Sequence, residues 1–223
     1  MTKSPFRYPG GKGRKAKDLA TLLQSACERV GLLSDPFVGG GSVPVELMQR
    51  VPDMKLHLND LNPWIAAFWE VVASGDIDKL VKRIEQCCPT VALHCELREH
   101  QPESLEDRAF YALFFNRTSF SGILSSGALG GNKQAGRATV TSRWNAAALK
   151  HSVLKLTECL AGKTTVTCKH IRDVELRGVL FIDPPYIGTG PILYRERMDR
   201  DAHIALAAKL KYYPLPLDCY LRQ

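Results

Sequence analysis

The order of elements near the start of the sequence constrains the fold more than any other feature. Residues 32–35 read as a short strand that runs into a glycine-rich turn at 36–41, and residues 42–50 read as a helix that begins where the turn ends. A second strand at 55–59 then ends at Asp60. Strand, glycine turn, helix, strand and acid is the opening order of a doubly wound α/β fold with a parallel sheet.

The rest of the sequence supplies further elements for such a fold. Apolar residues at helical spacing predict a helix over 17–30 that ends at Gly31, and Pro63 in a first-turn position opens another helix. Other segments are predicted from their patterns: helices at 76–88, 105–116 and 146–160, and strands at 164–168 and 178–182. The last strand has the unbroken apolar composition of a central parallel strand.

The glycine turn and Asp60 together indicate a nucleoside-bearing ligand. Residues 37–41 form the pattern Phe-x-Gly-x-Gly, in which glycines let the backbone approach a ligand closely. Such a turn can be purely structural, but Asp60 ends the next strand, where an acid can bind the hydroxyl pair of a ribose. The dinucleotide pattern Gly-x-Gly-x-x-Gly is not matched, because Val43 and Pro44 follow the turn. A nicotinamide dinucleotide is therefore disfavoured.

The sharpest single motif is Asp183-Pro184-Pro185-Tyr186, directly after the last predicted strand. An acid at the carboxyl end of a buried strand lies where open α/β sheets keep their sites. The carboxylate of Asp183 and the carbonyl of Pro184 can accept both hydrogens of one exocyclic amine. Tyr186 offers a face on which a base can stack. A bare strand-ending turn is the alternative, and the upstream turn with Asp60 makes it the weaker one.

A basic segment carries the net charge of the chain, which is +7. Residues 108–157 contain no Asp or Glu, and their cations equal the whole excess: Arg108, Arg117, Lys133, Arg137, Arg143, Lys150 and Lys155. Solvated faces usually mix both signs of charge, so this segment is typical of a surface that meets phosphates. A basic loop without a function is the alternative.

Composition and missing patterns disfavour several other classes. No apolar run is long enough to span a membrane and the N-terminus lacks the apolar core of a signal peptide, which favours a cytoplasmic protein. The cysteines and histidines between residues 87 and 100 lack the paired spacing of a zinc site. Residues 8–13 lack the spacing of a nucleotide phosphate loop. No Pro-Cys dipeptide exists to serve methylation at C5 of cytosine.

Five motifs in a fixed order carry a resemblance to a known family: RYPGGKGR at 7–14, DPFVGGGS at 35–42, NDLN at 59–62, FFNRTSFSG at 114–122 and DPPY at 183–186. The joint pattern resembles the D12-class, Dam-like adenine-N6 DNA methyltransferases. The resemblance implies a Rossmann-like catalytic domain at 1–73 and 158–223 that uses S-adenosylmethionine. A mainly helical target-recognition domain is expected as an insertion at 74–157. Double-stranded DNA is the expected substrate.

The same resemblance sets the wider context. It implies a bacterial or phage origin, no metal and no membrane partner. A monomer and a cognate restriction endonuclease as its counterpart are the working expectations.

The resemblance also assigns roles to single residues by motif alignment. Donor-binding positions are Tyr8, Lys12, Asp60 and Asp183, with Asp35, Phe37, Gly39 and Gly41 as a wall around the methionine part and Asp173 near the donor's adenine. The catalytic set is Asp183, Pro184, Pro185 and Tyr186. Asn116, Arg117, Ser119 and Phe120 are expected to read base edges or to wedge into the stack. Phosphate contacts are expected from four cations of the acid-free segment: Lys133, Arg137, Arg143 and Lys150. Simple packing of Phe120 is the alternative to its role as a wedge.

The expected reaction needs no covalent enzyme intermediate. The target adenine is flipped out of the duplex and stacked on Tyr186, while Asp183 and the Pro184 carbonyl orient its N6 amine. Family members usually continue through further strands after the helix near 201–207, and these strands are missing from the sequence. Two alternatives therefore stay open: a truncated, inactive relative that binds DNA or donor, and a methyltransferase that acts on RNA or protein.

Overall fold

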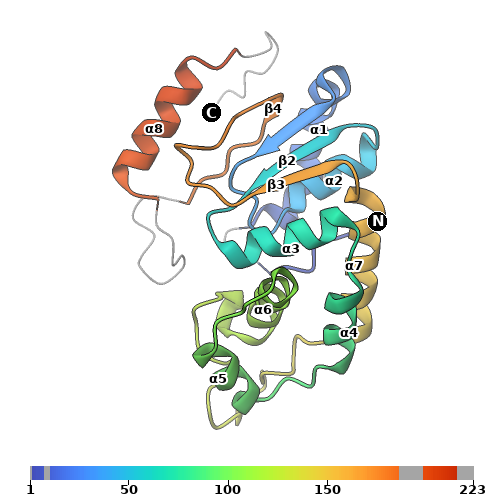
Figure 1. The fold of residues 1–223 in the computed structure, drawn as a ribbon, viewed down its shortest axis with the longest axis vertical. Helices are drawn as coiled ribbons and strands as arrows, with labels where there is room; N and C mark the ends of the chain where they lie inside the picture. Colours follow the sequence, from blue (N-terminus) through green and yellow to red (C-terminus); the bar gives the residue numbers. More distant parts are fainter. Residues whose placement is uncertain (1, 8–10, 186–197, 215–223) are drawn as a thin grey trace.

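A parallel sheet forms the centre of the molecule, seen in a computed structural model that describes residues 2–7, 11–185 and 198–214 (Figure 1). Its strands are β1 (Leu32–Asp35), β2 (Lys55–Asn59), β3 (Thr164–Thr167) and β4 (Val179–Leu180), in the order β3-β2-β1-β4. In register, Leu33 lies opposite Leu56 of β2 on one side and Val179 of β4 on the other. Because all pairs are parallel, the carboxyl ends of the strands meet at one edge, as predicted for an α/β fold.

Three helices pack directly around this sheet. The short 3-10 helix η1 (Lys12–Arg14) leads into α1 (Ala16–Val30), which packs against α2 (Ser42–Arg50) and contacts β4. The third helix, α3 (Pro63–Ser74), contacts β2 and β3. Its start is fixed by Asn62, whose side chain accepts hydrogen bonds from the N–H groups of Trp64 and Ile65, and by Pro63 in the first turn.

Four further helices extend the molecule below α3 in Figure 1: α4 (Asp78–Gln86), α5 (Val91–Glu99), α6 (Leu105–Thr118) and α7 (Ala146–Leu160). Aromatic contacts join α3 to α6, since the Trp64 ring stacks on Phe115 at 5.6 Å and meets the edge of Tyr111 at the same distance. One hydrophobic core runs from the sheet into these helices. The division into two domains stays a prediction, and α7 crosses its second boundary.

The last helix in the described part, α8 (Arg200–Lys211), lies beside β4 at the opposite end of the molecule from α5 (Figure 1). Ala202 and Leu206 pack with Ile171 and Val174 in a small separate core. The Nζ atom of Lys209 donates a hydrogen bond of 2.7 Å to the carbonyl of Val174. These contacts bring α8 against the segment between β3 and β4, next to the sheet edge.

Two predicted elements differ from the structure. Helix α5 was not expected, because Pro89 was taken as a break, whereas the chain restarts at once with Thr90 capping the N–H of Leu93. The strand predicted at 178–182 is shorter, and β4 is an outer strand of the described sheet rather than a central one. Beyond Leu180 the N–H of Phe181 still donates a hydrogen bond of 2.9 Å to the Ser34 carbonyl, before the backbone turns toward Asp183.

Candidate active site

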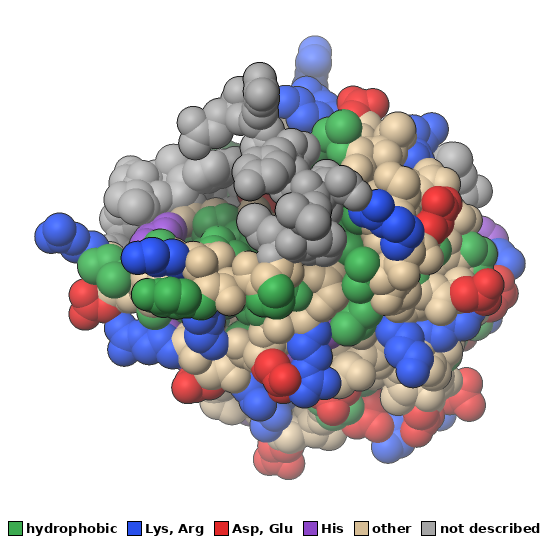
Figure 2. Space-filling view, turned by 90° about the horizontal axis from the view of Figure 1, so that it is seen from above, with side chains coloured by type: hydrophobic (Ala, Val, Ile, Leu, Met, Phe, Trp, Pro, Cys, Tyr) green, Lys and Arg blue, Asp and Glu red, His purple; other side chains and the backbone are tan. Residues whose placement is uncertain are grey.

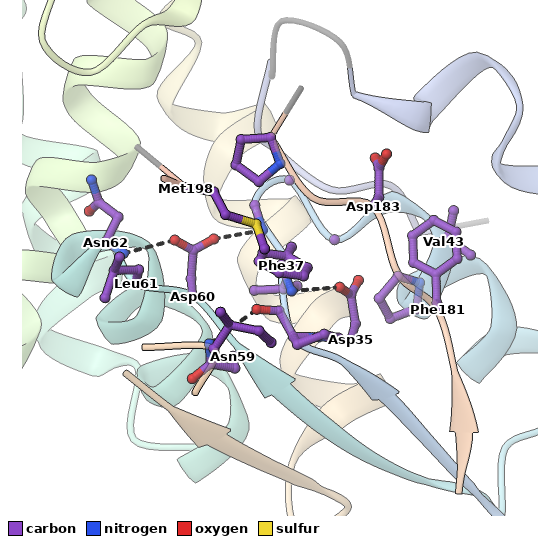
Figure 3. Close-up of a pocket in the computed structure, with 18 of the residues that line it drawn as sticks. Asp35, Phe37, Val43, Asn59, Asp60, Leu61, Asn62, Phe181, Asp183 and Met198 are labelled. Atoms are coloured by element: carbon purple, nitrogen blue, oxygen red, sulfur yellow. Dashed lines mark hydrogen bonds between the residues drawn. The ribbon is translucent and has the colours of Figure 1, made fainter. Parts of the chain in front are cut away.

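A pocket opens where the carboxyl ends of β1, β2 and β4 meet (Figure 3). Asp35 ends β1, Asp60 follows β2 and Asp183 stands three residues after β4, and the side chains of all three line the pocket. The sequence places these acids far apart along the chain, and only the parallel order of the strands brings them to the same edge. The pocket therefore combines the acids that the sequence singled out.

The glycine turn forms one wall and is fixed from two sides. Gly39 donates its N–H to Asp60 at 2.9 Å, and its carbonyl accepts a hydrogen bond of 3.0 Å from the indole of Trp69 on α3. Gly41 has a φ of 61°, and a Cβ atom there would lie 2.3 Å from the Trp69 ring. Only glycine satisfies both the left-handed backbone and this close contact. The turn is thus held in place by a strand end and a buried helix.

Two backbone N–H groups orient the carboxylate of Asp60. One carboxylate oxygen accepts the N–H of Gly39 and the other accepts the N–H of Asn62, both at 2.9 Å. A carboxylate oxygen can accept more than one hydrogen bond, which is compatible with the ribose contact that the sequence predicts for Asp60. Behind it, Asn59 is buried and joins the turn to the segment after β3 through hydrogen bonds to the carbonyls of Pro36 and Lys169.

Asp35 lies at the floor of the pocket and is only 1% exposed. Its carboxylate accepts a hydrogen bond of 3.1 Å from the N–H of Phe37. Burial raises the pKa of Asp35 well above its ordinary value; the Phe37 N–H opposes this, and the charges of Asp60 and Asp183 add to it. The neutral form of Asp35 therefore persists to a higher pH than that of an exposed aspartic acid.

Asp183 is held by a lysine from the other end of the chain. The Nζ atom of Lys12 on η1 lies 2.6 Å from each of its two carboxylate oxygens. Both side chains keep about a quarter of their surface exposed, at 25% and 28%. The two prolines that follow carry no N–H, so neither competes for this carboxylate. Asp183 consequently faces the pocket opening with a cation beside it.

An apolar lining completes the pocket, and the sequence analysis missed it. Its residues are Val43, Leu61, Ile171, Phe181 and Met198. Phe181 stands two positions before Asp183, and the two-residue period of extended chain would have placed both on one face. Ile171 and Met198 reach the pocket because α8 packs on the segment before β4, which no local pattern reveals.

Three of the predicted ligand-binding residues are not among the described residues that line the pocket. Tyr8 and Tyr186 lie outside the described residues. Asp173 is described, but it lies in a turn closed by a 2.8 Å bond from its own N–H to the His170 carbonyl, and its neighbours Lys169 and Ile171 line the pocket rather than Asp173 itself. Its contact with the donor's adenine stays a prediction.

The predicted DNA-binding residues divide into buried and exposed ones. Asn116 is fully buried, and its amide bonds the main chain of Arg7 at 2.8 and 3.1 Å and the carbonyl of Gly122 at 3.0 Å. Ser119 is also buried and lies 3.1 Å from the ring nitrogen Nε2 of His94. In this arrangement both side chains hold the loop together and offer no polar atom to a base edge. Phe120, by contrast, is 63% exposed.

The remaining predicted DNA contacts are cationic. Lys133 and Arg137 are exposed on the long segment between α6 and α7, and Arg117 and Arg143 are half-buried. On the face that Figure 2 shows, Lys and Arg side chains are interspersed with Asp and Glu, as on an ordinary solvated surface. In the described part of the chain, no group of three or more His, Cys, Asp or Glu side chains is placed to hold a metal ion. None of its helices is long and apolar enough to cross a membrane.

An acid-lined pocket at the carboxyl edge of a parallel sheet, beside a glycine turn, lies where open α/β proteins bind their ligands. Comparison with known families narrows this class. Residues 8–215 match the model of the D12 class N6 adenine-specific DNA methyltransferases, and the chain belongs to that family. It is also similar to the Type II methyltransferase M.MjaIII of Methanocaldococcus jannaschii. The two are 23% identical over 206 residues, which cover 83% of this chain and 70% of the relative. The protein is thus a DNA adenine methyltransferase with a Rossmann-like parallel sheet.

Proposed function

We propose that the methyl donor is S-adenosylmethionine, that it occupies the pocket at the sheet edge, and that Asp183 and Pro184 present the N6 amine of a DNA adenine to it. One observation carries this proposal: Asp60 and Asp183, a ribose-binding acid and an amine-orienting acid, line the same pocket. The family supports the reaction type, and the common pocket of the two acids supports the assignment of the donor and the adenine to neighbouring positions.

The chemistry of the pocket fits such a donor. The carboxylate of Asp60 suits the vicinal hydroxyls of a ribose, because backbone N–H groups aim each of its oxygens and a carboxylate oxygen can accept more than one hydrogen bond. Phe181 and Ile171 supply an apolar wall for a purine ring. Asp183 places a carboxylate near a ligand that carries a sulfonium cation. When bound, the donor supplies an activated methyl group.

Asp183 and the carbonyl of Pro184 then hold the two hydrogens of the adenine N6 amine. With both hydrogens accepted, the nitrogen lone pair points toward the methyl carbon. The donor would supply the methyl group: the N–C bond would form as the S–C bond breaks, the electron pair would stay on sulfur, and the proton that the amine loses would pass to the Asp183 carboxylate that accepts this hydrogen. Lys12 keeps the Asp183 side chain in a fixed orientation before the base arrives.

The loop around Phe120 is proposed to enter the DNA stack where the adenine leaves it. Phe120 sits in the 3-10 helix η2 (Phe120–Gly122), is 63% exposed and is backed by a 2.9 Å bond from its own N–H to the Gly127 carbonyl. Ser119 beside it is anchored by His94. A rigid base with an exposed aromatic tip is what an intercalating wedge requires.

Methyl transfer from labelled S-adenosylmethionine tests the proposal. The wild-type protein should label duplex DNA at adenine N6, whereas Asp183→Asn should lose about 10²- to 10³-fold in single-turnover rate. The exposed Asp53→Asn serves as a matched control and should react at the wild-type rate. Labelling of RNA instead of DNA, or binding of DNA and donor without any transfer by folded protein, would reject the proposal.

We also propose that the enzyme acts as a monomer and protects DNA from a cognate restriction endonuclease. Sequencing of methylated positions in DNA from cells that express the chain would define the target sequence. DNA so modified should resist an endonuclease that cleaves that sequence. Light scattering of the free protein and of its DNA complex tests the monomer, and a dimeric mass would reject it.

A further inference from the structure

Three arginines from distant parts of the sequence gather beside the C-terminal end of α6. Arg117 lies in the last turn of this helix. Arg7 is fixed next to Arg117 by Asn116, the residue before Arg117 in α6. The side chain of Asn116 accepts a hydrogen bond from the N–H of Arg7 and donates one to its carbonyl. Gly122 packs closely against the main chain of Arg7, since a Cβ atom at this position would lie 2.3 Å from the Arg7 carbonyl oxygen.

Arg143 reaches the same place through its neighbour Trp144. The Trp144 ring packs against Phe110 at 6.2 Å and against Phe114 at 5.8 Å. Phe110, Phe114 and Arg117 follow at helical spacings of four and three, so they share one face of α6. Packing of Trp144 on that face brings the adjacent Arg143 toward Arg117.

Nothing in the described part of the chain neutralises this group. No ion pair or side-chain hydrogen bond joins Arg7, Arg117 or Arg143 to an acid in residues 2–7, 11–185 and 198–214. The pKa of Arg117 is lowered by burial and by the charges of Arg7 and Arg143, and the pKa of Arg143 by burial and by Arg7. The three cations therefore repel one another in the free protein.

Two buried N–H donors at this place also lack a partner. Four buried side-chain polar atoms of the described residues have no hydrogen-bond partner, and two of them are Nε of Arg117 and Nε1 of Trp144. Unsatisfied buried donors are costly, and their concentration beside three cations indicates a missing acceptor that carries negative charge.

Other cations of the acid-free segment are different. Lys150 pairs with Glu85 on α4 at 2.7 Å, and Lys155 pairs with Glu158 at 2.6 Å. Both lysines are thus neutralised by an acid from outside residues 108–157, on α4 for Lys150 and in the last turn of α7 for Lys155. No such acid pairs with Arg117 or Arg143 in the described part of the chain, which argues against a surface that is basic merely by chance.

We propose that Arg7, Arg117 and Arg143 form one binding site for a single phosphodiester group of the DNA backbone close to the target adenine. Guanidinium groups bind phosphate oxygens through paired N–H donors, which suits arginine better than lysine at such a site. Lys12 is only five positions after Arg7 in the sequence, so their Cα atoms are at most about 17 Å apart. The bound phosphate therefore lies near the pocket that Lys12 and Asp183 form. The inference rests on DNA as the substrate of the proposed function.

In this arrangement Asn116 is a positioning residue that acts through Arg7. It fixes the main chain of Arg7 and leaves the arginine side chain exposed. The predicted role of Asn116 as a reader of base edges is replaced by a role in placing a phosphate contact. Because Asn116 comes directly before Arg117, the last turn of α6 fixes the positions of two of the three arginines, Arg7 and Arg117.

The site is tested with a short duplex that the wild-type protein methylates, by measuring binding over a range of salt concentrations. Arg117→Gln and Arg143→Gln should each weaken binding at least tenfold. They should also reduce the slope of log K against log salt by about 0.9, the value for one phosphate contact. Lys155→Gln removes one charge from the same segment outside the site and should change neither quantity by as much.

Neutral phosphates identify the contact directly. Methylphosphonate groups replace the phosphates of the duplex one at a time, and one position should weaken binding of the wild-type protein most. At that position Arg117→Gln should show little further loss, because the partner of the missing phosphate is already gone. Equal losses for variant and wild type at every position, or equal binding by Arg117→Gln and Lys155→Gln, would overturn the inference.

Two further measurements separate this inference from loss of folding and from the proposed function. Without DNA, Arg117→Gln should melt no lower than the wild type, because the substitution relieves repulsion between the arginines. Inorganic phosphate should raise the melting temperature of the wild type more than that of Arg117→Gln. If a glutamine variant does not fold, Arg7→Gln, whose side chain is exposed, takes its place. Wild-type protein that methylates DNA while its arginine variants bind normally would reject only the phosphate site.

Discussion

The acid-lined pocket and the arginine cluster of Arg7, Arg117 and Arg143 treat their charges in opposite ways. In the pocket, Asp60 accepts two backbone N–H groups and Asp183 accepts both of its bonds from Lys12. In the cluster, the cations face one another, and Nε of Arg117 is buried without an acceptor. The pocket is oriented before its ligand arrives, whereas the cluster is completed only by a partner.

This difference predicts two kinds of dependence on conditions. Charges that are already compensated inside the protein are little affected by salt, so variants of the pocket should change donor affinity or rate at any ionic strength. Charges that await a polyanion release counterions when it binds, so variants of the cluster should change the salt dependence of DNA binding. The following predictions test each side of this contrast.

The largest expected effect is on the stability of the glycine turn. Gly41→Ala should lower the free energy of unfolding by about 3 kcal/mol, because the new Cβ meets the Trp69 ring and the backbone is left-handed. Gly31→Ala is a matched control with a similar φ of 69° and nothing within 4 Å of its Cβ, so about 1 kcal/mol is expected. Urea denaturation measures both. Equal losses would show that the close contact with Trp69 does not fix the turn.

The next effect concerns the donor. Asp60→Ala removes the acceptor for Gly39 and Asn62 together with the expected ribose contact, so donor affinity should fall by about 30- to 100-fold. Calorimetry with S-adenosylmethionine at low and high salt measures it. A loss that vanishes at high salt would contradict a pocket whose charges are compensated internally. Asp53→Asn provides the control here as well.

Sequence reasoning located the pocket because its acids stand at predicted strand ends. Asp35, Asp60 and Asp183 could be placed at one edge once the strands were taken as parallel, and β1 does pair in parallel with β2 and with β4. Ile171 and Met198 could not be placed, since they reach the pocket through the packing of α8. A local sequence pattern predicts where strands end, but it does not predict which segments that are distant in sequence pack against each other.

The arginine cluster also could be predicted only in part from the sequence. The lack of acids in residues 108–157 indicated phosphate contacts, and Arg117 and Arg143 were among the candidates. Charge along the chain gave no sign that Lys150 is paired with Glu85, nor that Arg7 joins the group. The motif around Asn116 also suggested base reading, because a side chain that bonds a distant backbone cannot be told from an exposed one in sequence.

A smaller effect is expected at Phe120. Phe120→Ala should weaken binding of the duplex by about tenfold, as expected for loss of one stacking aromatic side chain, and should leave stability unchanged because the ring is 63% exposed. Tyr212→Ala removes another exposed ring, at 79%, next to the end of α8, and should not affect binding. Fluorescence of a base analogue opposite the target site would follow base flipping. Since no charge is lost, the salt dependence should stay at the wild-type value, in contrast to the arginine variants.

The smallest effect concerns the charge of the pocket itself. The pKa of Asp35 is raised above its ordinary value of 3.8, mainly by burial, so the folded protein holds this proton more tightly than the unfolded chain does. As pH rises from the unfolded pKa through the folded one, the unfolded state loses its proton first, and stability falls. Asp35→Asn cannot ionise and should escape that fall.

The expected result is therefore a difference that grows with pH. The urea midpoint of Asp35→Asn should rise relative to that of the wild type from mildly acidic to mildly alkaline pH, with Asp53→Asn as a variant that shows no such trend. A constant difference across this range would mean that Asp35 is charged in the empty pocket. In that case Asp35, Asp60 and Asp183 would all hold negative charge before a ligand binds. The pocket would then resemble the arginine cluster, in which like charges lie close together and are neutralised only when a ligand of opposite charge binds.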